Sequence, residues 1–415
     1  MSSRLLRILV TGSLLFSAGS GIARAQENKN DRGPVHIEPP QDDPSYRLMG
    51  EFIGPITVGE NQYQTVGLQI RPLGDNQFEA LSYTGGLPGQ EGYQGQPTST
   101  IGRLSDGFLV LSGAPWAIFV EQDHCLILSR TGERLGRLER LVRRSPTLGA
   151  KPPGEANVLF DGTGTEQFLD GAAVENGLLR AGATLKPMFQ DFDMHLEFML
   201  PYMPKARDQA RGNSGVYVQS RYECQILDSF GVLPTFNGAG SLYRFRAPDL
   251  NASLPPLVWQ TYDIRFTAPR WAADGTKIRN ARVSSWLNGV LVQSDVELEN
   301  KTGAGQPEEP NLQPTKLQDH SDPVRFRNIW VIDRGLAPLI DFPIAGSGDE
   351  EPPVAPAESA TPAPAEPATS AEPVAPSVPA TPAEPAAPAV EPAPATEQVP
   401  ATEQVPANEP AAPPA

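Results

Sequence analysis

Short apolar runs separated by turn-forming residues fill two regions of the chain. In residues 45–148 the runs, such as GFLVLSG and HCLILS, are bounded by Gly, Pro, Asp or Asn. This pattern predicts the strands of a small all-β domain, and it carries no chemical signature. In residues 155–336 the strand patterns are longer, and WLNGVLV contains an Asn-Gly pair between β-prone runs, which predicts a hairpin. Because strands are many and helical patterns few, we expect a β-sandwich, or jelly roll, in this second region.

The stretch YVQSRYECQILD, residues 217–228, alternates in an unusual way. Its intervening positions are mostly core material, but every second residue from 217 to 225 is large and polar. Burying such a row is costly unless its members pair with each other or line a wet groove. We interpret the stretch as a strand whose polar side lines a ligand cleft; the alternative is an ion pair between Arg221 and Glu223 on a solvated side. The row consists of Tyr217, Gln219, Arg221, Glu223 and Gln225.

Histidines supply further candidates for chemistry. His320 lies between Asp319 and Asp322, just before the last predicted strand. Nearby carboxylates raise the pKa of a histidine, so His320 is a candidate general acid or base; a surface histidine in a turn is the alternative. His195 lies on the polar side of DFDMHLEFML, as expected of any strand with one solvated face. His124 is isolated, and we interpret it as a packing residue rather than a metal ligand.

The two ends of the chain have compositions of their own. Arg4 and Arg7 precede an apolar run, and Ala-Arg-Ala at 23–25 is a typical cleavage site. We interpret residues 1–25 as a secretory signal peptide, with a retained anchor as the alternative, and expect a periplasmic or extracellular protein. The C-terminal part consists mostly of Pro, Ala, Glu, Thr and Val, which cannot build a core. We predict a disordered spacer there, with the cell envelope as a candidate contact.

Charge and cysteine content narrow the function classes. The net charge is −16, and most of it belongs to the C-terminal part, where no Lys or Arg follows Arg334. We therefore expect no nucleic-acid partner, although GERLGRLERLVRRS closes the first region. Cys125 and Cys224 are predicted to be buried free thiols, with a bridge between the domains as the alternative.

The chain divides into domains at SPTLGAKPPGEA, residues 145–156, where small residues and prolines separate the two strand-rich regions. The predicted parts are the signal peptide 1–25, a flexible segment 26–44, the small all-β domain 45–148, the sandwich 155–336 and the tail 343–415.

One comparison concerns the carboxylates around residue 225. Glu223-Cys-Gln225-Ile-Leu-Asp228 is similar to the E-x-D-x-x-E pattern of laminarinase-like retaining glycosidases. Positions five apart on a regular strand point to opposite faces, so Glu223 and Asp228 would cooperate only across a β-bulge. Gln225 also replaces the middle carboxylate that this mechanism uses. An ordinary retaining glycosidase is therefore an alternative rather than the main interpretation.

Seven motifs in order resemble those of the 3-keto-disaccharide hydrolase domain family. They span about residues 155–333 and leave the first domain and the tail uncovered. The motifs are LFDGTGTEQF (159–168), DFDMHLEFMLP (191–201), GNSGVYVQSRYECQILDS (212–229), GSLYRFRAPDLNAS (240–253), WQTYDIRFTAPRW (259–271), LNGVLVQSDVEL (287–298) and LQDHSDPVRFRNIWV (317–331).

The resemblance implies a concanavalin-like β-sandwich that cleaves glycosides already oxidised at C3 by a separate oxidoreductase. A ketone at C3 acidifies the proton on C2, so a base can remove that proton, and the C1 leaving group then departs by β-elimination. Water adds to the resulting glucal-type intermediate. Such a site needs a base near C2, a donor or cation at the developing enolate oxygen, and an acid for the leaving group.

The resemblance also implies roles for individual residues. Glu223 and His320 are the base and acid candidates, and Arg221 or Arg325 would stabilise the enolate. Asp228 and Asp319 would orient neighbours or help to hold a possible divalent metal ion; no cofactor is otherwise indicated. Tyr217, Gln219, Gln225 and Tyr243 would contact sugar hydroxyls. Ser321 stands where the family usually has Gly, and Arg244 where a small residue is more typical.

Two non-enzymatic classes remain open. A carbohydrate-binding module would keep the cleft but lack a competent base, so it would bind sugar without turnover. A structural protein of the envelope would use the tail and the first domain, and it would have no affinity for sugar.

Overall fold

The computed structural model describes residues 32–113 and 115–336. The predicted signal peptide and the predicted tail lie outside these residues. Within them the fold is almost entirely antiparallel β-structure, as the alternation of apolar residues predicts. None of the helices in the described ranges is long and apolar enough to cross a membrane.

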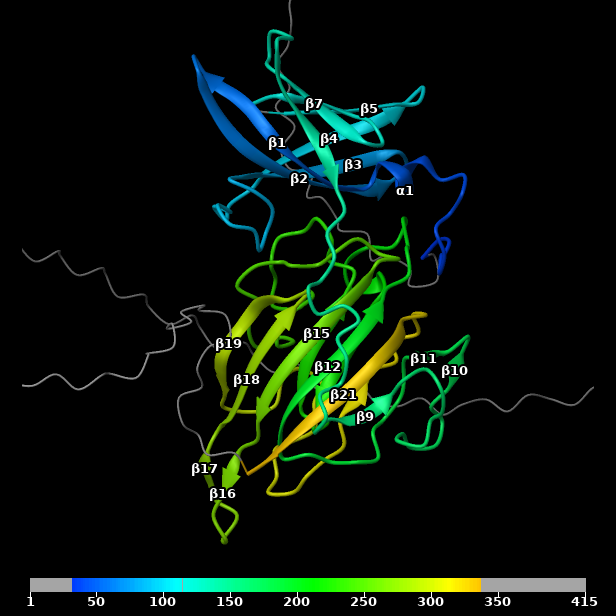
Figure 1. Ribbon diagram of the computed structural model, residues 1–415, viewed down its shortest axis with the longest axis vertical. Helices are drawn as coiled ribbons and strands as arrows, with labels where there is room; N and C mark the ends of the chain where they lie inside the picture. Colours follow the sequence, from blue (N-terminus) through cyan, green and yellow to red (C-terminus); the bar gives the residue numbers. More distant parts are fainter. Residues whose placement is uncertain (1–31, 114, 337–415) are drawn as a thin grey trace, which may run out of the picture. The chain divides into compact units, whose positions relative to one another are not determined.

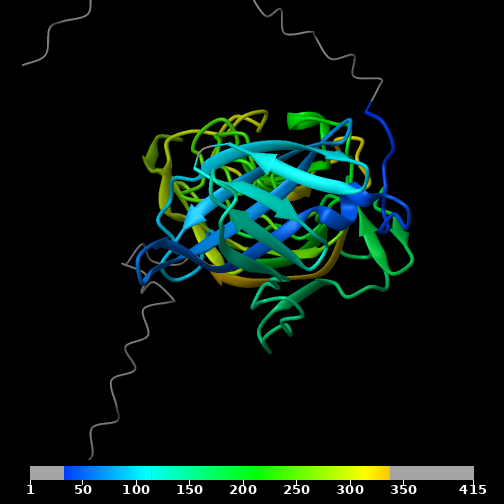
Figure 2. The same ribbon diagram turned by 90° about the horizontal axis from the view of Figure 1, so that it is seen from above.

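The first region forms a closed eight-stranded barrel in which β1 pairs with both β2 and β8 (Figure 1 and Figure 2). A short helix, α1 (Pro44–Leu48), precedes it and is capped by the Asp43 side chain. The GERLGRLERLVRRS stretch, which closes the first region, contains β8. The strands are β1 (Gly50–Gly59), β2 (Gln62–Gly74), β3 (Gln77–Thr84), β4 (Thr98–Ser105), β5 (Phe108–Ser112), β6 (Ala117–Val120), β7 (His124–Leu128) and β8 (Arg134–Leu141).

The second region contains one large and two small antiparallel sheets. The large sheet runs β10-β11-β21-β12-β15-β18-β19, with β9 paired to β21, as Figure 1 shows. The small sheets are β14-β13-β20 and β16-β17. The large sheet consists of β9 (Asn157–Phe160), β10 (Val174–Glu175), β11 (Leu178–Arg180), β12 (Asp191–Met199), β15 (Trp259–Thr267), β18 (Ala281–Leu287), β19 (Val290–Leu298) and β21 (Arg325–Gly335). The small sheets consist of β13 (Asn213–Val218), β14 (Tyr222–Leu227), β20 (Lys316–Leu317), β16 (Arg270–Trp271) and β17 (Lys277–Arg279).

The core of the second region lies between the large sheet and the β14-β13-β20 sheet. Alternate residues of β12, such as Phe192 and Leu196, belong to the same buried cluster as Val216 and Ile226 of the small sheet. The small sheet therefore turns its apolar side inward and its polar side outward, which is the two-layer arrangement of a β-sandwich. The predicted Asn-Gly hairpin joins β18 to β19, with positive φ at both turn residues.

The two cysteines are free thiols. Cys125 is fully buried in the barrel core, and Cys224 is fully buried in the sandwich core. Because the two thiols belong to separate clusters, the prediction of two buried free cysteines agrees with the structure, and the alternative of a bridge between domains does not.

The segment before the barrel is held by specific contacts, although the sequence suggested a flexible stretch. His36 exchanges two backbone hydrogen bonds with Tyr202, at 3.0 and 2.9 Å, and the two rings lie 5.8 Å apart. Arg32 forms a 2.7 Å ion pair with the buried carboxylate of Asp322. These contacts add residues 32–36 to the surface of the sandwich.

Candidate active site

The polar side of the β13-β14 hairpin is built around Glu223. Tyr217 lies directly opposite Glu223 in the register, and Gly215 lies opposite Gln225. A Cβ atom at Gly215 would lie 2.7 Å from Glu223 Oε1, so the carboxyl group of Glu223 extends over a position that only glycine can occupy without displacing it. The lack of a side chain at Gly215 thus makes room for the Glu223 carboxyl group.

Burial controls the ionisation of Glu223. Only 1% of the residue is exposed, and this desolvation raises the pKa of its carboxyl group to about 7, against the lowering effect of a hydrogen bond with Tyr217. Burial and the same hydrogen bond raise the pKa of the Tyr217 phenol, so Tyr217 is the donor in this pair. Glu223 Oε2 is buried and accepts no hydrogen bond from the residues described. Glu223 is therefore a carboxyl group poised to exchange a proton near neutral pH.

Amide side chains extend the polar surface beyond Glu223. In one orientation the Gln225 amide donates to Gln209 Oε1 at 3.2 Å, and in the opposite orientation it donates to Glu223 Oε1, also at 3.2 Å. Gln318 donates its backbone N–H to Gly215 O at 2.8 Å, and its own side-chain Oε1 is buried without a hydrogen-bond partner among residues 32–113 and 115–336. Unpaired acceptors of this kind suit a ligand that carries hydroxyl groups.

Two loops fix the backbone of Glu223. Tyr243 donates its N–H to Glu223 O at 3.0 Å, and Glu223 donates its own N–H to Thr302 Oγ1 at 2.7 Å. The half-buried Tyr243 ring packs against Gly303 of the second loop. The predicted neighbours Tyr217, Gln225 and Tyr243 are thus brought together with Glu223.

Gln219 and Arg221 do not belong to this polar surface, which corrects the interpretation of 217–225 as one strand. Gln219 and Ser220 have positive φ values of 47° and 57° and form a tight turn, closed by a 3.0 Å hydrogen bond from Arg221 N to Val218 O. The Gln219 amide donates to Phe189 O at 2.9 Å. A turn at this point ends the alternation on which the interpretation depended.

Arg221 anchors a loop instead of facing Glu223. The residue is 1% exposed, and its guanidinium donates to Pro307 O and Asn311 O, both at 3.0 Å, and to Asn311 Oδ1 at 2.5 Å. No ion pair joins Arg221 to Glu223 within the described ranges. The proposed ion pair between these two residues is therefore wrong, and the guanidinium is already used by the 307–311 loop.

The remaining acidic and basic candidates lie around this site without forming one cluster. Asp228 is buried in a 2.6 Å ion pair with Arg211. The exposed Asp319 accepts a 2.7 Å hydrogen bond from Ser321 N, and Ser321 has a φ of 65°, a conformation that glycine adopts more easily. His320, which lies between Asp319 and Ser321 in the sequence, is half-buried. Arg325 donates to Glu175 Oε2 at 2.8 Å and lines a cavity of about 220 Å³ to which Glu223 does not contribute.

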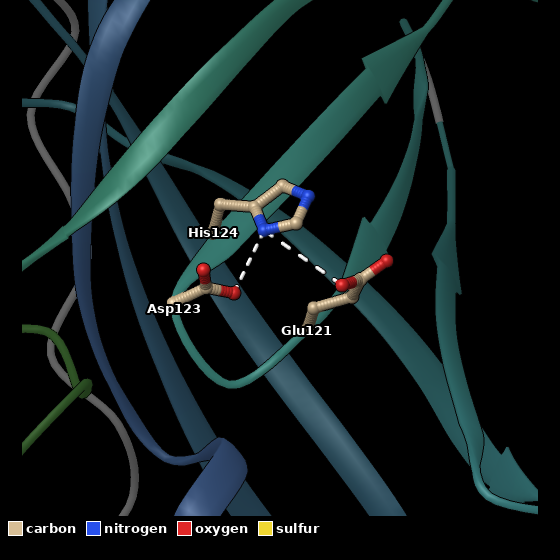
Figure 3. Close-up of side chains that lie close together, drawn as sticks. All are labelled: Glu121, Asp123 and His124. Atoms are coloured by element: carbon tan, nitrogen blue, oxygen red, sulfur yellow. Dashed lines mark hydrogen bonds and ion pairs between the residues drawn. The ribbon is translucent and has the colours of Figure 1, made fainter.

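The structure does not assemble Asp228 and Asp319 into a metal site. Within the described parts of the chain, the group of side chains with metal-ligand spacing is Glu121, Asp123 and His124 in the barrel (Figure 3). There His124 Nδ1 lies 2.8 Å from Asp123 Oδ1 and 3.8 Å from Glu121 Oε2. Asp228, in contrast, already has its charge balanced by Arg211, so it does not suit the ligand role that the resemblance implied.

His195 lies on the outer side of the large sheet, under the segment that joins the barrel to the sandwich. Its Nδ1 is 2.6 Å from Asp263 Oδ1, and its ring stacks on Trp330. Thr147 Oγ1 donates to Asp263 Oδ2 at 2.8 Å, and Gly149 N donates to Glu197 Oε1 at 2.6 Å. This side of β12 thus docks the connecting segment and is not solvated as the sequence pattern suggested.

The charges under the connecting segment stabilise one another. Burial alone lowers the pKa of His195, but its hydrogen bonds with Asp263 and Glu197 outweigh that effect and raise the pKa. Burial raises the pKa of Glu197, yet hydrogen bonds from His195 and three other groups lower it to about 2. An imidazolium between two carboxylates accounts for both directions. The His195 cluster is therefore structural.

Two residues of the candidate site, Lys316 and Gln318, were not predicted from the sequence. Lys316 pairs with Tyr217 across β20 and β13, so the two side chains share one face of the sheet. Lys316, Gln318 and His320 alternate along the chain, which was a usable signal. The prediction passed over it because only the histidine stood between carboxylates.

This geometry defines a class of protein: a β-sandwich with a buried carboxyl group on its outer polar face, where the pKa of that group lies near 7. Residues 155–332 match the family model described as the 3-keto-alpha-glucoside-1,2-lyase-like domain. The sandwich domain belongs to this 3-keto-disaccharide hydrolase family, the one that its seven motifs resemble, and is thereby a carbohydrate-active domain.

Solved structures similar to this chain come from Parabacteroides distasonis and are provisionally named glycosyl hydrolases. One is 33% identical and covers 44% of this chain and 84% of its own, with a TM-score of 0.41. Two others are each 17% identical and cover 43% of this chain. They are matched over 93% and 98% of their own lengths, with TM-scores of 0.33 and 0.31. No curated protein matches the chain.

Proposed function

We propose that the sandwich cleaves 3-keto-glycosides by elimination at C1 and C2 followed by hydration. The observation that carries this proposal is the buried Glu223 carboxyl group, with its pKa near 7, one hydrogen bond to Tyr217 and one unpaired oxygen. A general base works best when its pKa lies near the working pH. The proton on C2 of a 3-keto sugar is acidic enough for such a base to remove.

The proposed reaction balances in two steps. Glu223 takes the C2 proton, and the electron pair of that bond moves into the C3 carbonyl as an enolate. The enolate then restores the ketone, forms the C1–C2 double bond and expels the C1 alkoxide, which takes a proton from an acid. In the hydration, the deprotonated acid takes a proton from water as the hydroxyl adds to C1, and Glu223 returns its proton to C2, which releases the 3-keto sugar and restores both groups.

Residues on the same polar face fit the supporting roles. Tyr217 donates a hydrogen bond to Glu223, and the unpaired Oε2 is the oxygen that would take the C2 proton. Lys316, next to Tyr217 in the register, is the proposed cation for the enolate, because the Arg221 guanidinium already holds the 307–311 loop. His320 remains the proposed acid for the leaving group, and Gln225 and Tyr243 the proposed hydroxyl contacts.

We propose that this chain acts after an oxidation step and outside the cytoplasm. A separate oxidoreductase must first oxidise C3, because an unoxidised sugar has no acidic proton on C2. We also propose that the chain is exported by residues 1–25 and that its tail contacts the cell envelope, which follow from sequence composition alone.

Product analysis with a 3-keto-glycoside and its unoxidised parent tests the proposed function. We expect release of the aglycone from the keto form only. Cleavage of the parent would instead indicate an ordinary glycosidase. Binding of either sugar without turnover would assign a carbohydrate-binding module, and absence of both binding and turnover would leave a structural role.

The pH dependence of cleavage should report the ionisation of Glu223. The base must be deprotonated, so the acidic limb of kcat/KM for a 3-keto-glycoside is expected to rise about tenfold per pH unit and to bend over at about pH 7. An initial-rate profile from pH 5 to pH 9 measures this. A profile that is flat across pH 7 would exclude Glu223 as the titrating base of the free enzyme.

A further inference from the structure

One loop of the sandwich exposes three large apolar side chains. Leu233, Phe236 and Phe245, all between β14 and β15, are 53%, 54% and 42% exposed. The loop itself is well fixed, because Asn251 Nδ2 donates to Ser229 O and Val232 O at 2.6 and 2.8 Å. These side chains are therefore displayed from an ordered backbone, and exposed apolar groups of this kind often mark binding sites.

The same loop runs alongside Glu223. Gln225 N donates to Ser241 O and Tyr243 N donates to Glu223 O, both at 3.0 Å, so residues 241–243 extend the polar sheet by a further backbone pairing. Cys224 faces Leu242 in this pairing, which puts Tyr243 beside Glu223.

The exposed phenyl groups are tied to Tyr243 through its neighbours. Arg244 N donates to Phe236 O at 2.8 Å, and the Arg244 guanidinium stacks over the Tyr243 ring at 5.5 Å. Phe245 follows directly, in a turn closed by two hydrogen bonds between Leu242 and Arg246. Phe245 thus follows Tyr243 by two residues, and Phe236 is hydrogen-bonded to Arg244, the residue between them.

We propose that Leu233, Phe236 and Phe245 form a subsite for an apolar, aromatic leaving group of the glycoside. This proposal rests on the proposed function, in which the sugar ring occupies the polar surface at Glu223. The sugar hydroxyls match the amide and carboxyl groups there, whereas two phenyl rings and an aliphatic side chain offer nothing to hydroxyl groups. They do match an aromatic ring, which gains by stacking on phenyl and guanidinium surfaces.

Two 3-keto-glucosides of the same anomer, with 2-phenylethanol or ethanol as the leaving group, test the subsite. These alcohols have similar acidity, so a difference in kcat/KM reports contact with the phenyl group. We expect the phenylethyl glycoside to be preferred by on the order of tenfold, as for one buried aromatic ring. The double substitution Phe236→Ser and Phe245→Ser should remove that preference and leave cleavage of the ethyl glycoside unchanged.

A matched control and a binding measurement complete the test. Phe108→Ser, at a 71% exposed barrel position, should change neither rate. If the two glycosides are cleaved equally, or if the double variant retains the preference, the subsite proposal is overturned. Calorimetric binding of the unoxidised phenylethyl and ethyl glucosides separates this from a failure of the reaction. If the wild-type protein binds the phenylethyl glucoside more tightly than the ethyl glucoside and the double variant does not, the subsite is supported even where no keto sugar is cleaved. If the wild-type protein binds both glucosides equally, the subsite proposal is overturned.

Discussion

Glu223→Gln is expected to lower kcat/KM for a 3-keto-glycoside by about 10²- to 10⁴-fold, the usual contribution of a general base. The amide keeps the shape of the side chain and can still accept from Tyr217, but it cannot take the C2 proton. Initial rates at pH 8 measure the loss, because Glu223 is ionised in the wild-type protein above its pKa of about 7. Turnover within threefold of wild type would remove Glu223 from the mechanism.

The folding control for Glu223→Gln follows from the sign of the pKa shift. The folded-state pKa lies above the ordinary value of 4.5, so protonation stabilises the fold. That contribution is fully present below pH 4.5 and is lost as the pH rises through 7. The Glu223→Gln side chain cannot ionise, so this variant should be at least as stable as the wild type above pH 7.

Glu197→Gln is the matched control for activity. Glu197 is a buried acid on the outer side of the large sheet, so this variant should cleave the 3-keto-glycoside at the wild-type rate.

Arg221→Met is expected to destabilise the protein by about 2–3 kcal/mol, the usual effect of removing a charged hydrogen-bond donor and leaving its acceptors unsatisfied. Its guanidinium holds Pro307 O and both the carbonyl and the side chain of Asn311, and methionine can satisfy none of these acceptors. The free energy of unfolding from urea denaturation measures the effect. Arg103→Met, at an exposed position on β4, is the control and should change stability by less than about 0.5 kcal/mol.

The alternative for Arg221 is the direct catalytic role that the family resemblance implied. In that case the variant would fold with wild-type stability and lose turnover. A stable, inactive Arg221→Met protein would therefore contradict the anchoring role, whereas an unstable one that retains turnover at low temperature would support it.

Local patterns in the sequence determined the secondary structure and part of the site. Strict alternation in residues 191–200 predicted a strand with one core face, and Asn288-Gly289 predicted the hairpin that joins β18 to β19. Tyr217, Glu223 and Gln225 were grouped on one polar side, and the structure brings them together. Alternation and turn chemistry act over a few neighbouring residues, which is why one sequence suffices to detect them.

Only the tertiary structure decided where that polar row breaks. Gln219 and Ser220 adopt the positive φ values for which Asn-Gly is the usual signal, so nothing local announced the turn. The Gln219 amide and the Arg221 guanidinium find their acceptors at Phe189 and in the 307–311 loop, which are remote in sequence. The periodicity of a sequence reports only on neighbouring residues and cannot predict such distant partners.

The chemistry of the site was likewise decided by contacts distant in sequence. Lys316 reaches Tyr217 through the pairing of β20 with β13, and the loops at Tyr243 and Thr302 cover Glu223. Their packing excludes water from the carboxyl group, and this desolvation moves its pKa from the ordinary range to about 7. The sequence by itself determined that a glutamate would stand on a polar strand face; the folded chain determined that the pKa of this carboxyl group lies near 7.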